Sequence, residues 1–99
     1  MARLDLHRNR DGIGYLLDVQ ADILRSLNSR LVIPVLPLEQ APPPAGKLNP
    51  LVTVEGIVHS VVTQHMAAVS IGLLGVVVGS FDGRDTEVTA AVDFLISGI

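Results

Sequence analysis

Hydrophobic and polar positions alternate in the N-terminal third of the chain. Tyr15, Leu17 and Val19 alternate with Asp18 and Gln20. A period of two residues is typical of a strand with one face toward a core and the other toward water. The pattern therefore predicts a half-buried strand here.

The next apolar run, residues 30–35, is rich in β-branched side chains but contains Pro34. Proline cannot donate a hydrogen bond to a neighbouring strand, so we expect this strand at a sheet edge or at a bulge. The prolines that follow, from Pro37 to Pro50, predict an extended surface loop. A proline-rich recognition motif is the alternative, but no basic residue flanks the A-P-P-P run at residues 41–44.

Short strands continue through the middle of the chain. Residues 51–54 and 57–62 form two apolar runs joined by Glu55 and Gly56, which indicates a tight hairpin. Residues 65–74 are rich in Val and Ile and predict a further strand.

The hydrophobic period changes to that of a helix after the turn at residues 82–83. The apolar positions of this face are Val88, Ala91, Val92 and Leu95. Asp85 and Glu87 fall in the first turn, where carboxylates suit the helix dipole, and Gly98 marks the end. The chain thus reads as a series of short strands followed by one C-terminal helix, in a single domain over residues 1–99.

The composition is more apolar than a lone domain of this size requires. Hydrophobic residues make up 48% of the 99 residues and charged residues only 17%. This surplus predicts apolar surface buried against a partner or a second copy, with a Val-rich core as the alternative explanation.

Charge and cysteine content exclude several classes of function. The net charge of −3 argues against nonspecific nucleic-acid binding. Arginines and aspartates mix in the N-terminal third and predict a surface of mixed sign: Arg3, Arg8, Arg10, Arg25, Arg30, Asp5, Asp11, Asp18 and Asp22. Without cysteine, disulfides and thiolate metal sites are excluded and a reducing cytosol is compatible. We expect no signal peptide, and the apolar stretch at residues 66–79 is too short to span a membrane.

Residues that would carry catalysis are sparse. His7, His59 and His65 have neither the spacing nor the carboxylate neighbours of a metal site, and no G-x-S-x-G motif is present. We interpret the acidic residues near the helix start as a solvated N-terminus. No catalytic residue, metal or cofactor is therefore predicted.

Five short strings, in order over nearly the whole chain, resemble the CcdB family of toxins. They are D-V-Q-A-D-I-L at residues 18–24, R-L-V-I-P at 30–34, L-N-P at 48–50, M-A-A-V at 66–69 and G-I at 98–99. The resemblance implies a mainly β fold, a barrel-like antiparallel sheet with one C-terminal helix, which MazF-type endoribonucleases share. It also implies a homodimer with the C-terminal helices near the two-fold axis.

The resemblance further implies a cytoplasmic toxin that is not an enzyme. Such a toxin binds the A subunit of DNA gyrase and traps the cleaved DNA complex. A CcdA-like antitoxin neutralises it through a disordered segment, and the pair together binds operator DNA and represses its own operon. No membrane association is implied.

Site residues follow position by position from the same resemblance. The implied gyrase-binding residues are Ile23, Leu24, Asp93, Ile96, Ser97, Gly98 and Ile99. The implied dimer interface contains Val92, Leu95, Gly98 and Ile99. Ser97 departs from the family, which typically has a tryptophan there as its main anchor on gyrase. An alternative is therefore a CcdB-like protein that keeps its fold and antitoxin but has lost or changed its target. A MazF-like endoribonuclease is a third reading, opposed by the negative charge.

Overall fold

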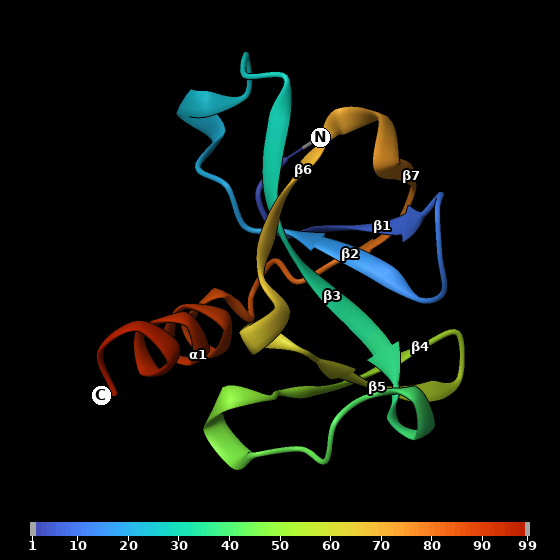
Figure 1. Ribbon diagram of the computed structural model, residues 1–99, viewed down its shortest axis with the longest axis vertical. Helices are drawn as coiled ribbons and strands as arrows, with labels where there is room; N and C mark the ends of the chain where they lie inside the picture. Colours follow the sequence, from blue (N-terminus) through green and yellow to red (C-terminus); the bar gives the residue numbers. More distant parts are fainter. Residues whose placement is uncertain (1, 99) are drawn as a thin grey trace.

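The computed structural model describes residues 2–98 and consists of short strands, short 3₁₀ turns and one helix (Figure 1). The strands are β1 (Asp5–Asn9), β2 (Tyr15–Asp18), β3 (Ser29–Pro37), β4 (Leu51–Val54), β5 (Ile57–Val61), β6 (Ala67–Ser70) and β7 (Leu74–Ser80). The helix is α1 (Asp85–Ser97). The 3₁₀ turns are η1 (Asp22–Leu24), η2 (Leu38–Gln40), η3 (Gly46–Leu48), η4 (Thr63–His65) and η5 (Ile71–Leu73).

All strand pairs are antiparallel, in the order β4-β5-β3-β2-β1-β7, and β6 pairs with the remaining length of β3. Figure 1 shows the sheet curling into a half-barrel, with α1 beside it. The predicted fold class, a barrel-like antiparallel sheet with one C-terminal helix, is confirmed.

β3 is the central strand, so Pro34 does not lie at a sheet edge, which was one of the two positions predicted for it. Pro34 stands opposite Leu16 of β2. On its other side β3 changes partner, from β6 up to Val32 to β5 from Val35 onward. The Pro34 carbonyl accepts a hydrogen bond from the Val62 amide on that side. The nitrogen and the carbonyl of a strand residue point to the same side. The Pro34 nitrogen, which has no hydrogen to donate, therefore faces the point where β3 changes from β6 to β5, and no hydrogen bond of either strand pair is lost.

The β4–β5 hairpin is confirmed at the predicted turn. Glu55 and Gly56 both have positive φ, 51° and 81°. Positive φ at both central residues is the geometry of the type I′ turn, which matches the twist of paired strands.

The segment at residues 65–74 differs from its prediction, since it is not one strand. β6 ends at Ser70, whose hydroxyl accepts a hydrogen bond from the Gly72 amide and caps η5. This local side-chain bond competes with the ladder and turns the chain before β7 begins. β7 then pairs with β1, a strand that the sequence pattern did not reveal.

β2 is buried on both faces, so it is not the half-buried strand predicted. Leu17 lies in the main core with Ile33, Val61 and Val88. Leu16 lies in a second cluster with Val32 and Leu74. The strand prediction holds, but the curled sheet covers the face that the alternation assigned to water.

Asp18 and Arg30 occupy that second face, and both side chains are 0% exposed. Arg30 donates to Asp18 Oδ2 from Nε at 3.0 Å and from Nη2 at 2.6 Å. The prediction of a mixed surface is therefore wrong for this pair, because each charge is buried against the other.

The helix is confirmed from its first turn to its end. Asp85 and Glu87 lie in the first turn, and the Gly98 amide donates to the Phe94 carbonyl at 2.9 Å. On the predicted apolar face Val88 and Ala91 are buried, and Val92 packs partly against the main core. Leu95 keeps 38% of its surface exposed.

Candidate functional site

The C-terminal end of α1, from Asp93 to Gly98, is exposed. Asp93, Ile96, Ser97 and Gly98 are all exposed, with Ile96 at 73%. The Ser97 hydroxyl donates to the Asp93 carbonyl at 2.8 Å, so this side chain folds back on the helix. Ile99, the last predicted contact residue, lies outside the described residues. Ile96 therefore supplies the projecting apolar side chain of this surface.

Phe94 was missed by the sequence analysis although it belongs to this helix end. Its ring is 39% exposed, and Lys47 Nζ lies 5.8 Å from the ring centroid. Phe94 falls outside the apolar face of α1 that starts at Val88. An aromatic residue outside the core-facing side of a helix indicates a candidate binding surface, and this pattern could have identified Phe94 from the sequence.

η1 presents the second predicted surface. Ile23 is 88% exposed and Leu24 is 47% exposed. Figure 1 places η1 and α1 on the same side of the molecule, one above the other in that view. The predicted contact residues thus form two separate patches rather than one.

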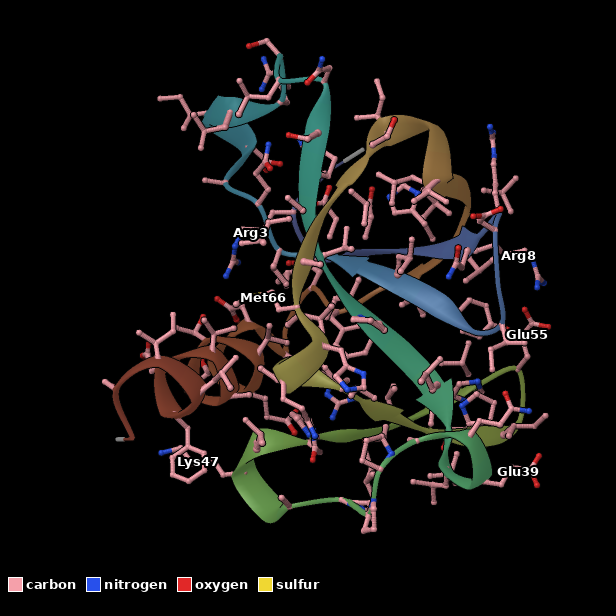
Figure 2. All side chains as sticks on the ribbon, in the orientation of Figure 1. Arg3, Arg8, Glu39, Lys47, Glu55 and Met66 are labelled. Atoms are coloured by element: carbon pink, nitrogen blue, oxygen red, sulfur yellow. The ribbon has the colours of Figure 1, made fainter. Side chains whose placement is uncertain are left out.

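A cavity of about 190 Å³ lies between the sheet and α1. Its walls are mainly apolar and are lined by Arg3, Val19, Leu31, Met66, Val88, Thr89, Val92 and Ile96. Figure 2 shows Arg3 and Met66 on the side of the sheet that carries α1. The cavity brings together Val92 and Ile96 of the predicted sets, whereas Leu95 is not among its lining residues.

Arg3 connects this cavity with η1. Its backbone amide donates to Asp22 Oδ1 at 2.7 Å, and its guanidinium Nη2 lies 3.4 Å from the Thr89 hydroxyl on α1. Arg3 thus stands between the two patches, at the wall of a mainly apolar cavity.

The remaining N-terminal arginines divide into buried and exposed groups. Arg30 is withdrawn into the ion pair with Asp18, so it is not free to contact a partner. Arg8 Nη2 forms an exposed ion pair with Glu55 Oε1 at 2.7 Å. Arg10 and Arg25 are exposed.

A further group of titratable side chains lies elsewhere, in a cavity of about 360 Å³ between the β1–β2 and β4–β5 turns. Tyr15 donates to Glu55 Oε1 at 3.0 Å, and burial, with Glu55, raises the pKa of Tyr15. His59 Nδ1 lies 2.8 Å from the Ile57 carbonyl. Figure 2 shows Arg8 and Glu55 at this end, away from the helix. Arg8 and Tyr15 both bond to Glu55, and the charges of Arg8 and Glu55 offset each other.

Within residues 2–98 no three histidine, aspartate or glutamate side chains gather in a way that could hold a metal ion. His7 is buried, with Nδ1 3.0 Å from the Gly75 carbonyl, and His65 is exposed. In the same part of the chain, no helix is long and apolar enough to cross a membrane.

Comparison with known families decides the relationship. The family model described as CcdB protein matches residues 3–98. The chain belongs to the CcdB family. No curated protein matches it closely enough to count as a relative. As a member of the CcdB family, it is a toxin of a toxin–antitoxin module, and the family is not a known enzyme family.

Proposed function

We propose that this CcdB-family toxin acts by binding the A subunit of DNA gyrase and trapping the cleaved DNA complex. The observation that supports it is the exposure of Ile23, Leu24 and Ile96, three large aliphatic side chains at the positions that the family resemblance assigns to gyrase. Exposed aliphatic side chains at such positions are the material of a protein interface. Gyrase acts on chromosomal DNA, so the proposed site of action is the cytoplasm.

Ser97 sets the expected strength of this contact. The family's tryptophan anchor is replaced by a hydroxyl that bonds to its own helix. Truncating an aromatic anchor often costs about 2 kcal/mol or more, roughly thirtyfold in affinity. The proposed binding therefore depends on Ile96, Gly98 and the η1 pair and is weaker than in relatives with tryptophan.

We also propose a homodimer, in which a second copy covers the part of α1 that carries Val92 and Leu95 and leaves Ile96 and Ser97 accessible to the target. Val92 lines the cavity and Leu95 is 38% exposed, as expected of side chains that a second copy buries. Gly98 and Ile99 complete this predicted interface. Light scattering at micromolar protomer concentration should give about twice the 10.5 kDa protomer mass. A monomer at this concentration would contradict the proposal.

A CcdA-like antitoxin is the second proposed partner, and operator DNA is bound only by the toxin–antitoxin pair. Arg3, Arg10 and Arg25 are available for charge-assisted contacts to an acidic, disordered segment. Calorimetric titration with the C-terminal segment encoded by the adjacent small gene tests this. Absence of binding would indicate an orphan fold without an antitoxin.

The gyrase proposal is tested by induced expression in a sensitive host and in a host with toxin-resistant gyrase. Growth arrest in the first only, with accumulation of cleaved DNA, supports gyrase as the target. A second candidate is a protein that keeps the fold but has lost its target, and the inward-folded Ser97 hydroxyl favours it. In that case only Ser97→Trp should arrest growth. RNA degradation with intact gyrase would instead support a MazF-like nuclease.

A further inference from the structure

The segment that carries the η1 surface is not held by a core. Every side chain from residue 21 to residue 28 is exposed, and η1 contains no buried residue. Short surface segments without buried apolar contacts open readily unless hydrogen bonds hold them. The orientation of Ile23 and Leu24 therefore depends on polar contacts.

Two polar contacts hold η1: the Arg3 backbone amide donates to Asp22 at the start of η1, and Gln20 joins the end of η1 to the sheet. Gln20 is only 9% exposed. Its Nε2 donates to the Leu24 carbonyl at 3.0 Å, and its Oε1 accepts from the Leu31 amide of β3 at 3.0 Å. One buried amide thus connects the end of η1 to the central strand.

The buried ion pair in turn fixes Gln20. Asp18 Oδ1 accepts a hydrogen bond from the backbone amide of Gln20 at 3.0 Å, while Arg30 donates to Asp18 Oδ2. Arg30 Nη1 is buried without a hydrogen-bond partner within residues 2–98. A well-packed apolar pair can often replace a buried ion pair without loss of stability, but it could not accept the hydrogen bond that Asp18 takes from the Gln20 backbone. The arrangement orients the backbone at residue 20 and, through the Gln20 side chain, the end of η1.

We propose that Gln20 is a positioning residue, which sets Ile23 and Leu24 in the orientation that the target binds without touching the target itself. This inference rests on the proposed role of those two residues in gyrase binding. A surface that is ordered before binding avoids the loss of freedom that a mobile segment suffers at the interface. Releasing η1 should therefore weaken target binding even in a fully folded protein.

The first test removes the side-chain amide of Gln20 while keeping the side-chain length. Gln20→Met should accelerate hydrogen exchange at the Leu24, Arg25 and Leu27 amides, which form the bonds within this segment. It should raise the dissociation constant for purified gyrase A subunit about tenfold. His59→Met is the matched control, because His59 is also buried, at 3% exposed, but bonds within the β4–β5 hairpin. Both variants are compared at temperatures where each is fully folded.

The second test is rescue by a conservative variant. In Gln20→Glu the carboxylate still accepts from the Leu31 amide but no longer donates to the Leu24 carbonyl. Lowering the pH from about 8 to about 5 protonates part of this buried carboxyl and restores a donor. Slow exchange in η1 and gyrase affinity should then recover together, relative to the wild type at each pH.

The outcomes separate the inference from the function on which it rests. Unchanged exchange at the η1 amides in Gln20→Met, or exchange altered equally by His59→Met, would overturn the positioning role whatever the target is. If the wild type and Gln20→Met bind gyrase equally well, the positioning role is also overturned. A wild type that does not bind gyrase refutes the proposed function, while the exchange measurements still decide how η1 is held.

Discussion

The buried Asp18–Arg30 pair allows a quantitative test of how this small fold tolerates charge. Arg30→Met keeps most of the side-chain volume but leaves the Asp18 carboxylate buried without its cation. Both side chains are 0% exposed, so solvent cannot take over the solvation. Removing one partner of such a pair destabilises proteins by about 3–5 kcal/mol.

The total stability of a 99-residue chain gives this loss its scale. At about 0.05–0.15 kcal/mol per residue, the free energy of unfolding is roughly 5–15 kcal/mol. A loss of about 4 kcal/mol would lower Tm by roughly 15–30 °C in a domain of this size. The single variant should therefore keep roughly 1–11 kcal/mol of its free energy of unfolding and melt at a clearly lower temperature than the wild type.

The double variant supplies the decisive comparison. Asp18→Asn retains an oxygen for the Gln20 amide but removes the carboxylate charge, so it should rescue part of the loss caused by Arg30→Met. We expect a coupling free energy of about 2–3 kcal/mol between the two substitutions. Urea unfolding followed by far-UV circular dichroism is suitable, because the chain has no tryptophan and only one tyrosine. Protomer concentration must be equal throughout. Additive losses within about 0.5 kcal/mol would refute the view that the two charges act as one buried unit.

Three further predictions concern other elements. Gly14→Ala should cost about 2 kcal/mol or more in urea unfolding, because an added Cβ would lie 2.4 Å from the Val35 carbonyl oxygen at a φ of +75°. Glu87→Gln should destabilise the protein slightly at neutral pH, because Arg84 lowers the pKa of Glu87 in the folded state. The stability that this ion pair contributes is present above the unfolded-state pKa and is lost as the pH falls through the folded-state pKa. The acid-unfolding curves of wild type and variant should therefore converge below about pH 4. Ser97→Trp should change the free energy of unfolding by less than about 0.5 kcal/mol and strengthen gyrase binding roughly thirtyfold, measurable by calorimetry, whereas a large drop in Tm would contradict an exposed position.

Features set by local pattern were predictable from the sequence. The helical period from Val88 onward and the Glu55–Gly56 turn need only neighbouring residues, and both are confirmed. β1 was missed because its two buried residues, Leu6 and His7, stand adjacent among polar neighbours and show no alternation. Its burial depends on β2 and β7 lying on either side, and local pattern does not encode that arrangement.

Long-range pairing limited the prediction of charged residues. Asp18 and Arg30 were assigned to the surface because isolated charges are rarely buried. Their pairing depends on the register of β2 against β3, which sets Asp18 opposite Val32 and brings Arg30 within reach. Site residues such as Ile23 came from family resemblance, since an exposed aliphatic side chain has no distinguishing local pattern.

The two halves of the candidate site should respond differently to mutation. On α1, Ser97 and Ile96 are exposed on a helix that Val88 and Ala91 already anchor in the core, so changes there alter affinity and leave the fold intact. On η1, the orientation of Ile23 and Leu24 depends on Gln20 and the buried pair behind it, so changes in that network alter stability and binding together. A substitution such as serine for tryptophan at position 97 should therefore change the free energy of unfolding very little. We therefore expect substitutions that lose or change the target to be tolerated more readily at the end of α1 than in η1.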